Sequence, residues 1–451
     1  MTVPPVAFAH PAAHPAAHPG AQPGAHPDAP AVDQAEPLTV DEAYARSHRA
    51  ALHPSVIGLV GLEIETHLVD LDSVGDHVPW DRVDPLPGAV CAAACRCAVT
   101  LEPGGQLELS GPPAADIAST VTELRADGQR ARLALAELRL GTAAAGADPL
   151  RPPRRVNPRS RYRAMEQHYA ATGRAWPAAV MMNSTAAMQV NLEAGPPGGW
   201  PERVARAYRL GPTLVAISAS SRWLSGRDTG WKSARQRAWS GLDQRACGPV
   251  PGCVACRAAS DAALDPASAW ARFALQAPVT FVRTRGGDAA AVGASISFEQ
   301  WASGAVRLGG RPPTAADLDT HLTTLFPPVR LRGYLELRYL DMTAPRWWPA
   351  IAAIVTTLMD DPAAADMATE VTERASRMWT EAARDGLDDP VLADSARRCL
   401  AIAAGRVPAG LVPAVADLAE LVESGRCPGD LLAQRIAEIG PHAALEELAH
   451  A

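Results

Sequence analysis

The chain has 451 residues, of which 47% are apolar and 20% charged, so it can bury a sizeable core. Its formal net charge of −7 argues against a protein that coats nucleic acid or an anionic membrane. It has no run of about 18 apolar residues, and its N-terminus lacks a basic segment before an apolar core, so neither a transmembrane helix nor a signal peptide is predicted. We therefore expect a cytoplasmic protein, and a monomer by default.

Composition also predicts how the chain is divided. Residues 1–36 are rich in Ala, Pro and His and are expected to be a disordered tail without a function of their own. We expect a catalytic domain over residues 37–345 and a helical C-terminal region, residues 346–451, packed on it. The eight cysteines are spread along the chain, which favours reduced thiols. Cys253 and Cys256 form a C-x-x-C, but a zinc site needs further ligands that the sequence does not offer, so chance thiols in a loop are favoured.

The stretch from residue 56 to 69 predicts the strand around which the rest is organised. Glu63, Glu65 and His67 alternate with apolar residues and so share one face. Two neighbouring carboxylates in an apolar strand resist burial unless a cation lies between them, and Mg²⁺ prefers such ligands. The alternative is a solvent-facing strand surface.

Three more strands are predicted to carry polar residues on one face. Cys97–Leu101 leads through a Pro-Gly-Gly turn into Gln106, Glu108 and Ser110, and Glu102 is placed to meet Glu108 across the turn. The other two strands are expected at residues 180–193 and 331–340, with a short strand at 279–282. Helices are predicted at 38–52, 114–140, 161–172, 201–221, 347–360, 363–385, 389–404, 412–424 and 428–448. The basic and aromatic stretch 222–241 is interpreted as a loop that positions anionic substrates rather than a nucleic-acid site.

This pattern predicts an α+β fold, with an antiparallel sheet whose apolar face packs on helices and whose polar face lines a cavity. That face would carry Glu63, Glu65, Glu102, Glu108, Gln189, Asn191 and Glu336, with Arg338 and Arg235 alongside. So many carboxylates require cations, and oxygen ligands without His or Cys favour Mg²⁺, or alternatively Mn²⁺, over zinc. Magnesium beside arginines suits phosphoryl transfer from ATP. No Walker loop occurs, so the nucleotide is expected on the sheet itself.

Four motifs then resemble the glutamate–cysteine ligases, most closely the branch grouped with plant enzymes and, within it, the ligase that serves ergothioneine biosynthesis. They are residues 61–65 (GLEIE), 102–110 (EPGGQLELS), 181–185 with 189–192 (MMNST and QVNL), and 335–341 (LELRYLD). The resemblance covers about residues 38–400 and implies a glutamine synthetase-like curved antiparallel sheet around the active site. It further implies that ATP, L-glutamate and L-cysteine yield γ-glutamylcysteine, ADP and phosphate through a γ-glutamyl phosphate.

Residue roles follow from the resemblance position by position. It implies that metal is held by Glu63, Glu65, Glu102, Glu108 and Glu336. Arg338 matches an arginine near the phosphates and, with Glu336, is assigned to catalysis. Arg235 resembles the arginine that engages the glutamate carboxylate, and Gln189 and Asn191 are assigned to substrate binding; some relatives have a His ligand where Gln189 stands. No general base for the amine is evident, and product phosphate or a site carboxylate are the alternatives.

Other function classes stay open at this point. A related carboxylate–amine ligase would keep the Mg-ATP site and use another amine acceptor. A metal-dependent amide hydrolase would need no ATP. A relative that binds glutamate or nucleotide without catalysis would retain the sheet alone.

Overall fold

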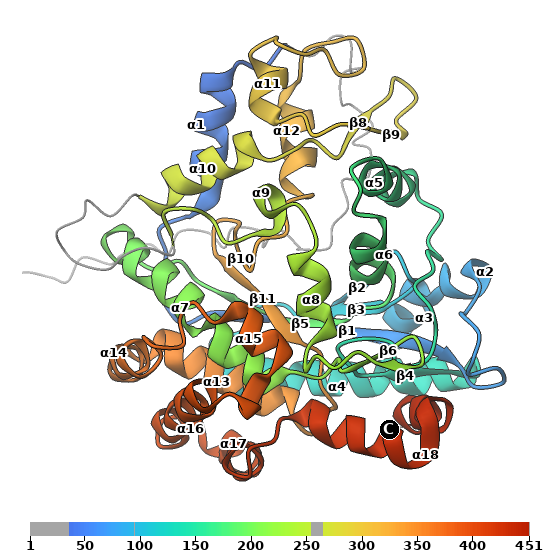
Figure 1. Cartoon of the computed structure of the whole chain (residues 1–451), viewed down its shortest axis with the longest axis vertical. Coiled ribbons are helices and arrows are strands. Elements are labelled where there is room, and N and C mark those ends of the chain that lie inside the picture. Colours follow the sequence, from blue (N-terminus) through green and yellow to red (C-terminus); the bar gives the residue numbers. More distant parts are fainter. Residues whose placement is uncertain (1–35, 94, 254–264, 451) are drawn as a thin grey trace, which may run out of the picture.

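One antiparallel sheet organises the molecule in the computed structural model, which describes residues 36–93, 95–253 and 265–450 (Figure 1). Its strands run in the order β10-β11-β5-β1-β3-β2, and β4 pairs with the far end of β1. They are β1 (Val60–Asp70), β2 (Ala98–Leu101), β3 (Leu107–Ser110), β4 (Leu140–Ala143), β5 (Ala187–Leu192), β10 (Val329–Leu331) and β11 (Leu335–Asp341). Every neighbouring pair is antiparallel, which confirms the predicted α+β sheet.

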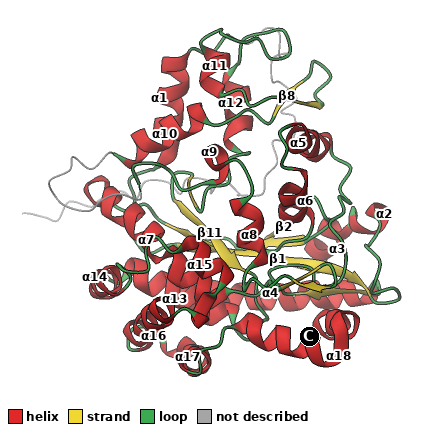
Figure 2. Ribbon diagram, viewed as in Figure 1, coloured by secondary structure: helices red, strands yellow, loops and turns green. Residues whose placement is uncertain are grey.

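Helices cover the two faces of this sheet in different ways (Figure 2). On one face α4 (Ile117–Glu137), α7 (Trp200–Ser218) and α13 (Trp348–Asp360) pack directly against strands, in contact with β1, β11 and β5 respectively. Farther from the sheet lie α14 (Pro362–Val371), α16 (Pro390–Ala404) and α17 (Val412–Glu423). By contrast, α15 (Trp379–Arg384) touches Tyr339 of β11 through Trp379, and α18 (Pro428–His450) packs against β4. Residues from 348 onward are thus mainly helical, as predicted, whereas the domain boundaries at residues 36 and 345 stay predictions.

The opposite face of the sheet is framed by shorter elements. These are α5 (Ser160–Ala171), α6 (Ala175–Asn183), α8 (Ala234–Ser240), α9 (Gln244–Cys247), α10 (Pro266–Gln276) and α12 (Ala315–Leu322). Farther out lie α1 (Val40–Ala51), α11 (Phe298–Ala302) and the small strands β8 (Phe281–Arg283) and β9 (Ala289–Ala291). The elements α2 (Trp80–Val83), α3 (Leu86–Ala92), β6 (Trp223–Leu224) and β7 (Arg227–Asp228) complete the described chain, apart from three 3₁₀ turns.

Local sequence explains where several elements begin and end. Thr39 caps α1 in a capping box with Glu42, so the helix predicted from residue 38 begins at Val40. Asp116 caps α4 by accepting a hydrogen bond from the Ser119 amide. The same helix ends where Arg139 adopts a left-handed backbone (φ 58°), so the chain turns directly into β4.

Five predicted elements are wrong in detail. Residues 180–183, predicted to start a strand, instead end α6, because Ala, Met and Val there pack as one helix and alternation begins only at Ala187. The helix predicted to reach residue 140 stops at Glu137, which leaves room for β4. Residues 363–385 divide into α14 and α15, and the stretch predicted as a loop at 222–241 contains α8. The apolar residues before β1 lie outside the strand, and Val56 is 87% exposed.

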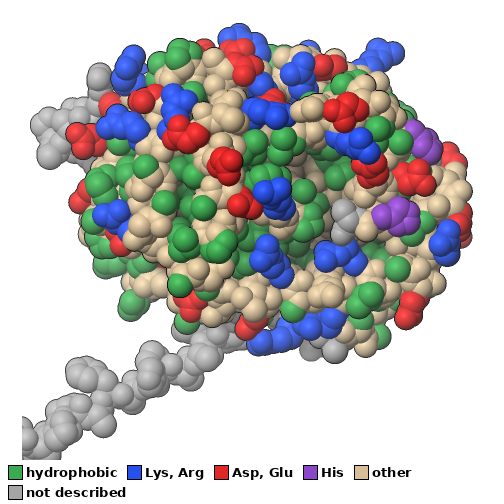
Figure 3. Space-filling view, turned by 90° about the horizontal axis from the view of Figure 1, so that it is seen from below, with side chains coloured by type: hydrophobic (Ala, Val, Ile, Leu, Met, Phe, Trp, Pro, Cys, Tyr) green, Lys and Arg blue, Asp and Glu red, His purple; other side chains and the backbone are tan. Residues whose placement is uncertain are grey.

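Composition-based expectations can also be compared with the described residues. Six described cysteines carry free thiols, namely Cys91, Cys95, Cys97, Cys247, Cys399 and Cys427, whereas Cys256 and the tail up to residue 35 lie outside the described residues. Within the described chain, every helix is too short or too polar to cross a bilayer. On the face seen in Figure 3, basic and acidic side chains are interspersed rather than gathered by sign.

Candidate active site

Strand register aligns the predicted polar residues in rows across one face of the sheet. In the first row Glu65 of β1 pairs with Glu108 of β3, which pairs in turn with Thr100 of β2. In the next, Glu63 lies between Ser110 of β3 and Gln189 of β5. A third row joins Asn191, Glu336 and Arg330 across β5, β11 and β10. Adjacent antiparallel strands therefore bring residues that are far apart in the chain onto one surface.

Above these rows lies a cavity of about 510 Å³. Its floor includes Glu63, Glu65, Glu102, Glu108 and Gln189. Its walls combine aromatic and thioether side chains with cations, namely Tyr162, Met165, Met181, Met182, Trp239, Trp270, Phe326, Arg161, Arg330, Arg332 and Arg338. A cavity that combines apolar walls with convergent polar groups is the usual form of a small-molecule site.

Each strand carboxylate is held by short polar contacts. Asn191 Nδ2 donates to Glu63 Oε1 at 2.8 Å. The Ala187 amide and Gln189 Nε2 donate to the two Glu65 oxygens at 2.8 and 3.1 Å. Thr100 Oγ1 donates to Glu108 at 2.8 Å, and Ser110 Oγ donates to the same oxygen at 3.1 Å. These neutral donors orient the carboxylates without removing their charge.

Burial and mutual repulsion make the ionised form of this cluster costly. Burial raises the pKa of Glu63, and the charges of Glu108 and Glu336 raise it further. Burial likewise raises the pKa of Glu65, Glu102 and Glu108, each with a carboxylate neighbour that adds to the shift. A cation between these groups would remove both penalties, as expected for oxygen ligands of Mg²⁺.

Glu336 has a different environment from the other four carboxylates. Arg330 donates to both of its oxygens, and Arg332 and Arg338 donate at 3.3 and 3.1 Å. Burial raises the pKa of Glu336, but Arg330 and Arg338 more than offset this and hold it well below its ordinary value. Arg338 also donates to Gln189 Oε1 at 2.6 Å. Glu336 thus anchors three guanidinium groups here, and its additional metal role stays a prediction.

Arg235 is close to the cavity but does not line it. Its guanidinium lies 4.6 Å from the centre of the Trp239 ring, and Trp239 is a wall residue. One terminal nitrogen donates to the Arg338 carbonyl at 2.6 Å. The buried Nε and Nη1 have no hydrogen-bond partner among the described residues. A guanidinium with two unused donors is suited to an incoming carboxylate, but its predicted contact with glutamate requires Trp239 to move.

The carboxylates do not yet form a finished metal site. Among the described residues, no three His, Cys, Asp or Glu side chains converge closely enough to bind an ion as they stand. Their donor chemistry nevertheless fits Mg²⁺, because the four carboxylates that line the cavity supply only oxygen ligands. Side-chain rotation would be needed to bring these oxygens to a common centre.

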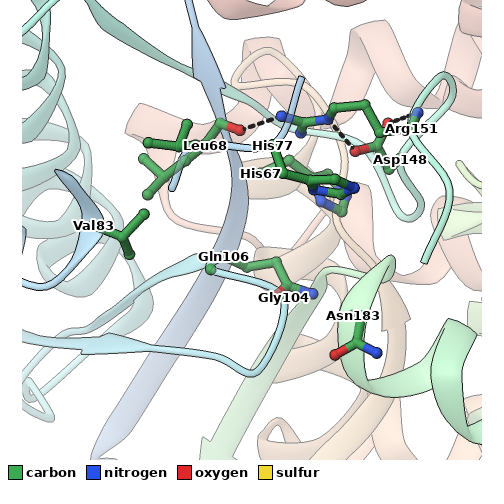
Figure 4. Close-up of a pocket in the computed structure, with 11 residues that line it drawn as sticks. His67, Leu68, His77, Val83, Gly104, Gln106, Asp148, Arg151 and Asn183 are labelled. Atoms are coloured by element: carbon green, nitrogen blue, oxygen red, sulfur yellow. Dashed lines mark hydrogen bonds and ion pairs between the residues drawn. The ribbon is translucent and has the colours of Figure 1, made fainter. Parts of the chain in front are cut away.

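His67, predicted to share a face with Glu63 and Glu65, points into a separate and much smaller cavity (Figure 4). That cavity has a volume of about 10 Å³, which is near the space of one water and excludes a substrate. Asp148 and Arg151 form a buried ion pair there at 2.7 Å, and Arg151 also donates to the Leu68 carbonyl. Burial lowers the pKa of His67 to about 4, so the imidazole is neutral at physiological pH. Gln106 lines both cavities.

The cavity also contains charged residues that sequence reasoning missed. Arg330 and Arg332 come from β10 and the turn after it, and Arg161 comes from α5. A signal for the first two was present, because Arg alternates with Leu from Arg330 to Arg332 just before the strand that carries Glu336. Nothing in the local pattern of α5 distinguishes Arg161 from the other arginines nearby.

Comparison of this sequence with known proteins gives matches described as glutamate–cysteine ligases. A family model described as glutamate-cysteine ligase family 2 (GCS2) matches residues 59–449. The chain is 45% identical over 418 residues to the glutamate–cysteine ligase EgtA of Mycolicibacterium smegmatis, which covers 91% of this chain and 95% of that protein. It is 46% identical over 402 residues to EgtA of Mycobacterium tuberculosis, covering 87% and 90%. The chloroplastic glutamate–cysteine ligase of Brassica juncea is 27% identical over 324 residues, covering 71% and 60%.

A solved structure has a similar fold. The glutamate–cysteine ligase of Francisella tularensis, in complex with AMP, superimposes with a TM-score of 0.54 over 88% of each chain at 13% identity. At that identity the likeness concerns the fold alone, and it agrees with the antiparallel sheet and surrounding helices described above.

Proposed function

Because this chain belongs to glutamate-cysteine ligase family 2, we propose that it joins the γ-carboxylate of L-glutamate to the amine of L-cysteine, using ATP. The family predicted from the four sequence motifs is confirmed. The products would be γ-glutamylcysteine, ADP and phosphate, and we propose that the dipeptide feeds ergothioneine biosynthesis, in line with the two EgtA relatives. The observation that carries the proposal is the cavity in which carboxylates on β1 and β3 face arginines on β10 and β11.

The chemistry needs two steps, because a carboxylate is a poor acyl donor. First, a γ-carboxylate oxygen of glutamate forms a bond to the γ-phosphorus of ATP, and the bond to the ADP oxygen breaks. Then the cysteine nitrogen bonds to the acyl carbon, the carbon–oxygen bond to phosphate breaks, and the amine loses a proton. Both steps bring anions together, so positioned cations supply most of the catalysis.

We propose that three arginines bind the phosphates. Arg338 is the catalytic candidate, because it lines the cavity and lies between Gln189 and Glu336. Arg330 and Arg332 lie beside it, oriented by the same carboxylate. Guanidinium groups that are already fixed by hydrogen bonds lose little freedom when they bind a phosphoryl group. We therefore assign Glu336 to orienting these arginines in addition to its predicted catalytic and metal roles.

The carboxylate floor would hold Mg²⁺. The proposed ligands are Glu63, Glu65, Glu102 and Glu108, whose pKa values are raised mainly by burial and further by neighbouring carboxylates. When bound, Mg²⁺ would neutralise the phosphate oxygens as one anion approaches another. Gln189 and Asn191 keep Glu65 and Glu63 in place through hydrogen bonds, and we propose that both also contact substrate. Arg235 would receive a glutamate carboxylate on Nε and Nη1, which make no hydrogen bond among the described residues.

Product analysis tests this function. We expect purified protein with Mg-ATP to release ADP only when glutamate and cysteine are both present, and to form γ-glutamylcysteine. Glutamate-dependent ADP release that cysteine does not increase would keep the acyl-phosphate chemistry but replace the acceptor amine. ATP-independent turnover, or binding of glutamate without any turnover, would reject the ligase. The Glu63→Ala variant should be inactive, whereas the Glu123→Ala variant, at a half-buried ion pair with Arg96 outside the cavity lining, should match wild type.

A further inference from the structure

Asp341 is a buried carboxylate at the end of β11, outside the cavity lining. It is 1% exposed and accepts three hydrogen bonds, from the Ser220 amide at 3.0 Å, Ser221 Oγ at 2.6 Å and Ser233 Oγ at 3.0 Å. Its conformation is fixed by packing as well, because a Cβ added to Gly146 would approach Asp341 Cγ to 2.7 Å. A carboxylate bound this completely organises the groups around it.

The same two serine hydroxyls also accept hydrogen bonds from backbone amides of α8, so they connect Asp341 to this helix. While Ser221 Oγ donates to Asp341, it accepts from the backbone amide of Arg235 at 3.1 Å. Ser233 Oγ, the N-cap of α8, accepts from the Gln236 amide at 3.1 Å. The first turn of α8 is thus linked to Asp341 through two hydroxyl groups, those of Ser221 and Ser233. A second link ties Gln236 Nε2 to the Tyr339 carbonyl of β11 at 2.8 Å.

The residue placed by this turn is Arg235. Its Nη1 lies 3.8 Å from Asp341 Oδ1, and its Nη2 is bound to the carbonyl of Arg338. Both contacts are made to β11, the strand that also carries Glu336 and Arg338. Asp341 therefore sets where the guanidinium of Arg235 stands relative to the arginines proposed for the phosphates.

We propose that Asp341 is a positioning residue for the amino-acid substrate, holding Arg235 and the first turn of α8 at a fixed distance from Arg338. This inference rests on the proposed function, in which Arg235 receives a carboxylate of glutamate. In this role Asp341 contacts neither substrate nor ATP. It orients only Arg235, so its loss should affect glutamate binding and leave the phosphate end of the cavity unchanged.

The Asp341→Asn variant tests this role. An amide keeps the volume, but it removes the charge facing Arg235 and presents a donor where three donors already point. We expect the KM for glutamate to rise at least tenfold, while kcat and the KM values for ATP and cysteine stay within about threefold. Asp341→Glu restores the charge and should recover part of the loss if backbone space allows. Equal glutamate KM values for wild type and Asp341→Asn would overturn the proposal.

A matched control separates positioning from general stability. Asp317 is also buried, and it accepts from a backbone amide, a hydroxyl and an arginine, here Thr314 and Arg311. Asp317→Asn should lower the melting temperature without changing the glutamate KM. If both Asn variants raise every KM in step with their melting temperatures, Asp341 is merely structural and the inference is wrong.

A double variant tests whether Asp341 acts through Arg235. In an Arg235→Lys background, Asp341→Asn should add less than about threefold to the glutamate KM, because the residue it positions is already altered. Full additivity would contradict the proposal.

Glutamate binding measured by calorimetry needs no acceptor amine, so it distinguishes failure of the proposed function from failure of this inference alone. No binding to wild type rejects the proposed function together with this inference, whereas equal binding to wild type and Asp341→Asn rejects the inference alone.

Discussion

Among the floor carboxylates, Glu102 has the fewest partners. The others accept hydrogen bonds from neighbouring side chains or amides, whereas the hydrogen bonds of Glu102 within the described chain involve only its backbone. Burial and the nearby charges of Glu108 and Glu65 raise its pKa. The charge of Glu102 therefore opposes folding of the ligand-free protein. A carboxylate at this position is explained by ligand binding rather than by packing.

Glu102→Gln should accordingly separate stability from activity. Without metal at pH 8 we expect the variant to be more stable than wild type by on the order of 1 kcal/mol, because one repelled charge is gone. We expect kcat/KM to fall at least about 100-fold, because a proposed metal ligand is lost. Thermal melts in EDTA and steady-state kinetics measure the two effects. The half-buried Glu123→Gln should change neither quantity, and wild-type activity in Glu102→Gln would remove residue 102 from the site.

Arg338 offers the corresponding test for the phosphate end of the cavity. Arg338→Ala leaves Glu336 with its two-point contact to Arg330, so the fold should survive. We expect kcat to fall about 100-fold or more, with a smaller change in glutamate KM, because the guanidinium is proposed to act on the transferring phosphoryl group. Arg346→Ala, at an exposed ion pair with Asp417, provides the control. An unchanged kcat would show that Arg338 does not act on the phosphates.

At the scale of elements, the β2–β3 turn places two of the carboxylates. The Glu102 amide donates to the Gln106 carbonyl at 2.9 Å, and Gln106 Nε2 donates to the Thr185 carbonyl at 2.9 Å, beyond the end of α6. Gly104 lies so close to α6 that an added Cβ would be 2.2 Å from the Asn183 carbonyl oxygen. The turn can approach α6 this closely only with glycine at residue 104.

Gly104→Ala should therefore displace the turn and the carboxylates on each side of it. We expect a loss of about 1–3 kcal/mol in folding stability, as for other overpacked sites, together with a fall in kcat/KM of at least tenfold. Gly88→Ala is the control, because Gly88 is in α3, its added Cβ meets no atom within 4 Å, and alanine favours a helix. A Gly104→Ala enzyme with wild-type kinetics would show that this close approach does not position the carboxylates.

The same elements show how far sequence reasoning reaches. Alternation identified β1, β3, β5 and β11 and the faces of their carboxylates, because side-chain direction in a strand has a period of two. It failed at Val180 to Asn183, where a short apolar run has no period that separates helix from strand. The ion pairs of Glu336 and the covering of Arg235 by Trp239 depend on which elements meet in space, and local patterns do not carry that information.

For the whole molecule, the balance of charge in the cavity couples folding to pH and to metal. The pKa values of Glu63 and Glu102 are raised to about 8, mainly by burial, from an ordinary value of 4.5. A carboxyl group with a raised pKa in the folded state gives up its proton more readily when unfolded. The contribution of such a group to folding stability is therefore fully present below about pH 4.5 and is lost as the pH rises through about 8.

We therefore expect the melting temperature in EDTA to fall as the pH increases from about 5 to 9, beyond what the exposed groups produce. Magnesium should reverse this fall, and its stabilising effect should increase across the same interval, since only ionised carboxylates bind it. Scanning calorimetry at several pH values, with EDTA or with Mg²⁺, measures both trends. Replacing both Glu63 and Glu102 with Gln should flatten the EDTA profile and abolish most of the Mg²⁺ effect. A Mg²⁺ stabilisation that does not depend on pH, or that persists in the double variant, would place the metal at other residues and leave the raised pKa values without a functional explanation.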